Sequence, residues 1–182
     1  MATIAILYLF RKKDLRNNDI IKRTDSTILA PVNGVIIKIK KDKEINGRLY
    51  TQFTIMIATL NEWGFYLPAS SEVESLEKVE GNKLFRFGML PSKHEWDLKR
   101  QYILKLQTKQ KKDIILKVFP CRAGFEPDIW INPGDRGIAG ACFGLMPFGG
   151  IVRLCLPNPI NLFVEEGDLL VTSETVMANL QE

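Results

Sequence analysis

A succession of short apolar segments, separated by turn residues, most constrains how this 182-residue chain can fold. The segments are rich in β-branched residues and cover residues 35–40, 52–58, 102–107, 114–119 and 151–156. Short segments of this kind at such spacing are typical of strands in a sandwich or partial barrel. Helix signals are sparse. We therefore expect a mainly β protein with few short helices.

Two stretches between these segments have a weaker pattern. The acidic residues 71–80 predict either one turn of helix or an edge strand. Residues 108–112 are rich in Lys and Gln and lie between two predicted strands, so they predict a solvated hairpin loop. The alternative for this loop is a basic surface that binds a partner.

One internal repeat points to a duplicated fold. Residues 132–140 resemble residues 165–173, and each copy places a Gly-Asp turn before a short apolar run. Such duplication occurs in biotinyl and lipoyl carrier domains. We expect a single domain, residues 1–182, with an N-terminal segment (1–27) and a β core (28–182). The β core should contain two similar halves. No lysine stands at a tight hairpin tip between the halves, which argues against a carrier function.

Composition and charge narrow the function classes. Hydrophobic residues make up 46% of the chain and charged residues 25%, the balance of a soluble globular protein. The net charge of +4 favours an anionic surface such as acidic lipid, but it is too small to indicate nucleic acid. We expect no nucleic-acid partner.

The cysteines and the histidine argue against a metal site. Cys121, Cys142 and Cys155 have no CxxC spacing, which indicates free thiols in a reducing compartment and hence a cytoplasmic protein. One histidine, His94, cannot complete a zinc site with cysteines so scattered. We interpret His94 as a surface loop residue, with an acid–base role as the alternative. We expect no metal.

The N-terminal apolar run, residues 1–10, is followed by three basic residues, 11–13. It has half of the roughly 20 apolar residues that span a bilayer. The order of charges also differs from that of a signal peptide. The run predicts a buried or edge strand, with a shallow membrane contact as the alternative that would make the protein peripheral to a membrane.

Six segments then line up, in order, with motifs of one enzyme family. They are residues 9–13 (against FFRDP), 28–36 (SPADGxV), 61–69 (DVHVNRxPV), 134–144 (GDxVxxGxxxG), 147–157 (FGSxV and LP) and 164–178 (VxxGDxVxAGETVxA). On these motifs the chain resembles the small, pyruvoyl-dependent phosphatidylserine decarboxylases over nearly its whole length. The resemblance implies a lyase fold that acts on a phospholipid.

The resemblance also implies that the chemistry of the family is lost here. In the family a serine hydroxyl attacks the preceding carbonyl, and the serine becomes a pyruvoyl group that serves as electron sink. A His oriented by an Asp takes the serine proton. The resemblance places Gly150, which follows Gly149, at the serine position. It places Trp63 at the His position and Asn61 at the Asp position, and the Arg that follows in the family falls near Tyr66. Because Gly150 has no hydroxyl, we expect no pyruvoyl cofactor and no catalytic residue.

Apolar residues flank this degenerate position. Phe143, Met146 and Phe148, with Tyr66, are candidates for a groove that binds a lipid tail, and core packing is the alternative. We predict a non-catalytic relative of phosphatidylserine decarboxylase that binds phospholipid or acts as a structural or regulatory partner. The partner would be another protein or a second copy of this chain. Two alternatives stay open. One is an active lyase whose processing serine has been replaced by Gly150, and the other is a protein-interaction module without lipid binding.

Overall fold

The structure is a computed structural model that describes residues 25–57, 63–84, 95–121 and 125–181. Its main element is an antiparallel sheet of eight strands in the order β13-β2-β3-β11-β7-β6-β5-β9. In chain order these strands are β2 (Gly34–Ile45), β3 (Arg48–Ile57), β5 (Ser71–Val79), β6 (Gln101–Thr108), β7 (Asp113–Pro120), β9 (Arg136–Gly137), β11 (Gly150–Pro157) and β13 (Leu169–Leu170). The sheet ends at β13 and β9 and is open, so the prediction of a mainly β fold is confirmed.

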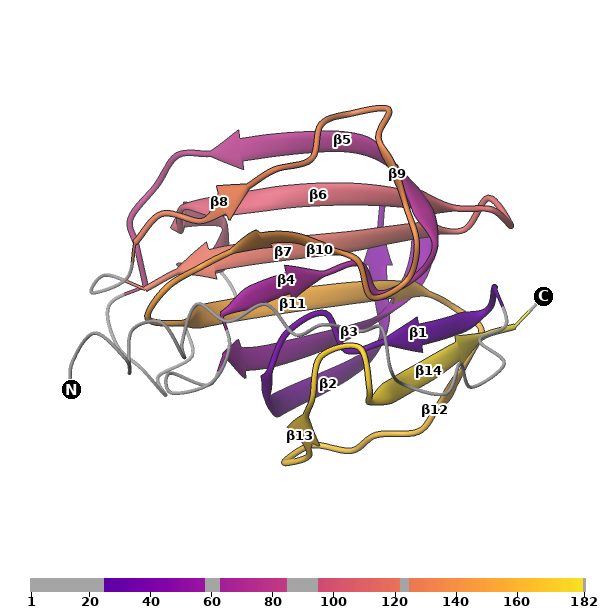
Figure 1. Ribbon diagram of the computed structural model, residues 1–182. Coiled ribbons are helices and arrows are strands. Elements are labelled where there is room, and N and C mark those ends of the chain that lie inside the picture. Colours follow the sequence, from indigo (N-terminus) through magenta and orange to yellow (C-terminus); the bar gives the residue numbers. More distant parts are fainter. Residues whose placement is uncertain (1–24, 58–62, 85–94, 122–124, 182) are drawn as a thin grey trace, which may run out of the picture.

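Two small sheets form a second layer in front of the large one (Figure 1). Each has three antiparallel strands. One holds β1 (Thr27–Leu29), β14 (Val176–Leu180) and β12 (Ile160–Leu162), and the other holds β4 (Gly64–Tyr66), β10 (Cys142–Leu145) and β8 (Asp128–Ile129). Helix is confined, in the described residues, to the 3₁₀ turn η2 (Glu95–Leu98), and no helix there has the length and apolar character to cross a bilayer.

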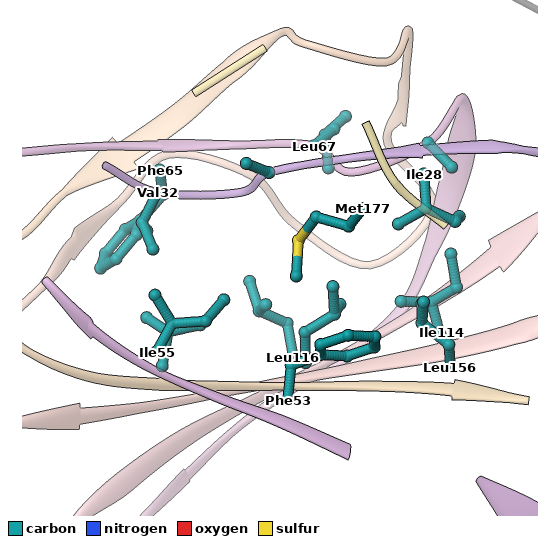
Figure 2. Close-up of a cluster of buried hydrophobic side chains, with 14 of the residues drawn as sticks. Ile28, Val32, Phe53, Ile55, Phe65, Leu67, Ile114, Leu116, Leu156 and Met177 are labelled. Atoms are coloured by element: carbon teal, nitrogen blue, oxygen red, sulfur yellow. The ribbon is translucent and has the colours of Figure 1, made fainter. Parts of the chain in front are cut away.

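The core lies between the layers and follows from strand alternation. Phe53 and Ile55 on β3 are fully buried, as is Leu116 on β7, because alternate side chains of these strands face the small sheets. Figure 2 shows Met177 of β14 pointing from the small sheet toward this surface. Each fully buried side chain of this kind contributes about 1.5–3 kcal/mol to folding.

The predicted ambiguity at residues 71–80 resolves in favour of a strand. β5 pairs along its length with β6, from Ser71↔Thr108 to Val79↔Gln101. On its other side it pairs only at its start, with the two residues of β9. Most of β5 is therefore an edge strand, and its acidic outward positions suit that place.

The two Gly-Asp turns occupy equivalent places in a duplicated arrangement. Gly167 donates its N–H to the carbonyl of Ile36 at 2.7 Å, and Gly134 donates its N–H to the carbonyl of Val73 at 2.8 Å. Both glycines have positive φ, 97° and 93°, which glycine adopts at little cost. A two-residue strand follows each turn, β13 against β2 and β9 against β5.

The two copies meet through a reciprocal pair of hydrogen bonds. Leu29 donates its N–H to the carbonyl of Pro68 at 2.8 Å, and Tyr66 donates its N–H to the carbonyl of Pro31 at 2.9 Å. Each bond maps onto the other when the residues of one copy are exchanged for those of the second. The two halves are thus related by an approximate twofold axis between these segments, as the sequence repeat predicts.

Candidate functional site

Gly150, which the motifs predict to stand at the serine position, begins a central strand. β11 lies between β3 and β7, and Gly150 pairs with Pro120 at the end of β7. The preceding residues Phe148 and Gly149 both have positive φ, 64° and 79°. The chain therefore turns sharply through two left-handed residues before it enters the sheet at Gly150.

The sheet leaves no room for a side chain at Gly150. A Cβ atom there would lie 2.5 Å from the carbonyl oxygen of Phe119 and would also clash with Cε of Met146. Real Cβ atoms essentially never come this close to another heavy atom. The methyl end of Met146 can rotate away, but the Phe119 oxygen belongs to the backbone of a central strand. The position thus lacks both the hydroxyl and the space for one.

The position of Phe119 is held from the outer face of the large sheet. Its ring packs edge-on against Trp96 of η2, with ring centroids 4.8 Å apart. The guanidinium of Arg153 on β11 lies over the Trp96 ring at 3.4 Å from its centroid. This stack, together with the register Ile151↔Phe119, resists a shift of the Phe119 backbone.

Trp63, which the motifs predict to stand at the histidine position, packs on the turn before Gly150. Its side chain is buried, its carbonyl accepts the N–H of Met146 at 3.0 Å, and its ring centroid lies 5.0 Å from that of Phe148. The Phe148 ring also lies 5.6 Å from Phe125. Phe148 is 46% exposed and Phe125 61% exposed. We call these three side chains, Trp63, Phe125 and Phe148, the aromatic surface.

The structure separates the four predicted ligand-binding residues. Phe148 is at the surface, whereas Phe143 and Met146 are buried in the main core and Tyr66 is buried outside that cluster. Tyr66 pairs with Cys142 between β4 and β10. Phe125 was missed by the sequence reasoning, because its place beside Phe148 depends on a long-range contact without a local signal. Asn61, His94 and the N-terminal residues 1–13 lie outside the described residues.

Glu126 anchors the segment that carries Phe125, one of the three residues of the aromatic surface. Its carboxylate accepts hydrogen bonds from Arg100 Nη1 and from the Tyr102 hydroxyl, both at 2.6 Å, and it pairs with Lys83 at 3.1 Å. Desolvation alone would raise the pKa of Glu126, but the bonds from Tyr102, Lys83 and Arg100 outweigh it and lower the pKa to about 2. Desolvation and the bond to Glu126 raise the pKa of Tyr102. The carboxylate therefore stays charged and is held by these three partners.

The described cysteines are free thiols. Cys121 and Cys155 are buried, Cys142 is half-buried, and none forms a disulfide. Burial raises the pKa of the Cys121 and Cys155 thiols, which keeps them protonated and poorly nucleophilic. In the described ranges, no group of three or more His, Cys, Asp and Glu residues is placed to hold a metal ion.

Comparison with known proteins agrees with the sequence motifs. Over 99% of its length, and over 77% of the relative's, the chain is 24% identical to the phosphatidylserine decarboxylase proenzyme of Wolbachia sp. subsp. Brugia malayi. It is 25% identical to that of Ehrlichia chaffeensis (87% of this chain, 70% of the relative) and 26% identical to that of Prosthecochloris aestuarii (85% and 70%). No protein-family model and no solved structure matches. Similarity that spans nearly the whole chain, in a β-rich fold with the expected repeat, supports the resemblance of this chain to the phosphatidylserine decarboxylase family.

Proposed function

We propose that this protein is a non-catalytic member of the family, which binds phospholipid at the aromatic surface without decarboxylating it. One observation carries the first half of the proposal. At Gly150 the chain has no nucleophile, and the Phe119 carbonyl oxygen lies where a Cβ would need space. Self-processing breaks the bond before the nucleophile by forming an ester through a side-chain oxygen. Glycine cannot form that ester, so no pyruvoyl group can arise here.

The aromatic surface supports the second half. Phe125 and Phe148 expose large apolar side chains beside each other, over the buried ring of Trp63. Exposed apolar groups that cluster in this way mark binding surfaces. Aromatic rings bury much apolar area at low conformational cost, which suits contact with acyl chains. The excess of basic residues over acidic ones would add attraction to an anionic bilayer.

Intact mass and a decarboxylation assay test the loss of catalysis. We expect one species at the full 20.7 kDa, and no carbon dioxide release from phosphatidylserine. A chain cut between Gly149 and Gly150, with a blocked N-terminus on the smaller fragment, would instead favour the catalytic alternative.

Vesicle co-sedimentation tests lipid binding. Phe148→Asn suits the left-handed backbone at that position, since Asn tolerates positive φ. We expect Phe148→Asn and Phe125→Asn to weaken binding to phosphatidylserine vesicles about tenfold together. Phe163→Asn is the matched control, because Phe163 is 57% exposed but follows β12 in the other small sheet. Equal loss in all variants, or no binding by the native protein at low salt, would contradict lipid binding and leave a protein partner as the better reading.

A further inference from the structure

A pocket of about 810 Å³ lies where β5 begins, β6 ends and β9 passes. This volume is within the range of small-molecule sites, roughly 300–1,000 Å³. The pocket is remote from Gly150. It adjoins the β6–β7 turn, whereas Gly150 lies beside Pro120 at the far end of β7. The eight residues of β7, at roughly 3.3 Å per residue, place its two ends about 25 Å apart.

One wall of the pocket is a cationic hairpin turn. Lys109 and Lys111 both line it. Thr108 fixes the turn, since its carbonyl accepts the N–H of Lys111 at 2.9 Å and its hydroxyl accepts the N–H of Lys112 at 3.1 Å. Lys109 Nζ pairs with Asp25 at 3.2 Å, but both side chains are more than half exposed, and such pairs yield readily to a ligand.

The opposite wall supplies further donors. Arg136 on β9 uses Nε in an ion pair with Glu72 at 2.7 Å, and its two terminal NH₂ groups remain as donors on the same planar fork. Ser70 accepts the N–H of Ala139 at 3.1 Å, which fixes its hydroxyl at the pocket and leaves the O–H to donate. Beside them Ile138, 74% exposed, forms an apolar rim.

The duplication provides an internal comparison for these residues. The place of Arg136 after its Gly-Asp turn is taken in the other copy by Leu169, and the place of Ser70 is taken by Asn33, which accepts the N–H of Thr172 at 2.9 Å. The same backbone therefore forms with leucine where the pocket has arginine. The fold does not require Arg136, so a ligand is a better reason for its presence than stability.

We propose that this pocket binds a phosphate ester. Arg136 would meet two phosphate oxygens through its fork, and Lys109 and Lys111 would balance the remaining charge from the other wall. The Ser70 hydroxyl would donate to a third oxygen, and Ile138 would contact the organic part. The ester group is common to a soluble sugar or glycerol phosphate and to a phospholipid headgroup. This site is separate from the aromatic surface and does not depend on it.

Calorimetric titration of the full chain with sn-glycerol 3-phosphate tests the proposal, with glycerol as the blank. We expect a Kd below about 1 mM, and about tenfold weaker binding in Lys111→Gln and in Arg136→Gln. Lys38→Gln is the matched control, because Lys38 is an exposed lysine on β2 outside the pocket. Circular dichroism verifies that each variant folds. Arg136→Gln also removes the ion pair with Glu72 and could disturb β9. Lys111→Gln changes only a turn residue, so it reports on binding independently of that effect.

A second arm uses phosphatidylglycerol vesicles to distinguish the source of the ester. Binding of glycerol 3-phosphate that falls in the pocket variants supports a soluble ligand. Vesicle binding that falls in Lys111→Gln but not in Phe148→Asn supports a lipid headgroup in this pocket. The proposal is overturned by a lack of response to both probes, or by a loss in Lys38→Gln as large as that in Lys111→Gln, which would indicate charge attraction without a site.

Discussion

The carbonyl oxygen of Phe119 faces Gly150 across neighbouring strands, 2.5 Å from the point where a Cβ atom would stand. The sheet thus requires glycine at position 150, and this glycine supplies no nucleophile. The edge-on packing of Phe119 against Trp96 makes the oxygen difficult to displace. Introducing a hydroxyl at this position would therefore meet a steric obstacle before any chemistry began.

We predict that Gly150→Ser neither cleaves itself nor folds as stably as the native chain. The added Cβ should cost about 1–3 kcal/mol of unfolding free energy, as overpacking usually does. Gly150→Ala, which adds the Cβ without the hydroxyl, should lose a similar amount. Urea denaturation and intact mass measure the two effects.

A double variant separates the two contacts at Gly150. Met146→Ala in the Gly150→Ser background removes the clash with Met146 but leaves the Phe119 oxygen in place. The cost of the serine, measured against Met146→Ala alone, should therefore persist. Disappearance of that cost, or efficient self-cleavage of Gly150→Ser, would show that the strand can accommodate a side chain and would favour the catalytic alternative.

The second prediction concerns acid. The folded-state pKa of Glu126, about 2, lies below the ordinary value of about 4.3, so the unfolded chain binds the proton more readily. The carboxylate stabilises the fold above the ordinary value, and this contribution is lost as pH falls toward 2. Glu126→Gln should cost on the order of 1 kcal/mol at pH 7, a discounted figure because the side chain is 39% exposed.

Denaturation at several pH values verifies this dependence. The difference between native protein and Glu126→Gln should shrink between about pH 4.3 and pH 2. Glu74→Gln, on an exposed position of β5, is the control and should differ little from the native protein throughout. A difference for Glu126→Gln that stays constant over this range would mean that its network does not depend on the charge.

A third prediction tests the duplicated turns. The carboxylate of Asp135 accepts the N–H of Asn132, and that of Asp168 accepts the N–H of Glu165, both at 2.8 Å. Asp135→Ala and Asp168→Ala should each cost about 1 kcal/mol, the typical net value of one hydrogen bond. Because the turns belong to separate copies, the double variant should show the sum. Urea midpoints that differ widely between the single variants would argue against equivalent roles.

The fourth prediction concerns the thiols. Cys121 and Cys155 are buried and their thiols have raised pKa values, whereas Cys142, at the start of β10, is half-buried. In native protein at pH 8, a thiol reagent such as Ellman's reagent should modify no more than one cysteine promptly, and in guanidinium it should modify three. Cys142→Ser should abolish the prompt reaction. Prompt modification of two or more cysteines in native protein would contradict this burial.

The amino-acid sequence by itself determined the strand content and the duplication. Runs such as residues 52–58 and 114–119 are short, apolar and rich in β-branched residues, so local composition suffices to predict strands. The Gly-Asp turns are equally local, because glycine at Gly134 and Gly167 supplies the positive φ and the Asp carboxylate bonds to an N–H three residues earlier. The motif order was enough to predict the resemblance to phosphatidylserine decarboxylases, which the similarity to curated relatives supports.

Only the tertiary structure decided what surrounds these residues. Phe125 meets Phe148, and Lys111 and Arg136 line one pocket, because strand order and register bring distant segments together. The acidic residues of β5 became a strand through pairing with β6, although their local pattern left a helical turn open. The crowding at Gly150 likewise arises from the Ile151↔Phe119 register and from a methionine in the adjoining turn. Local sequence specifies the period of an element, whereas packing between elements sets which atoms share a given space.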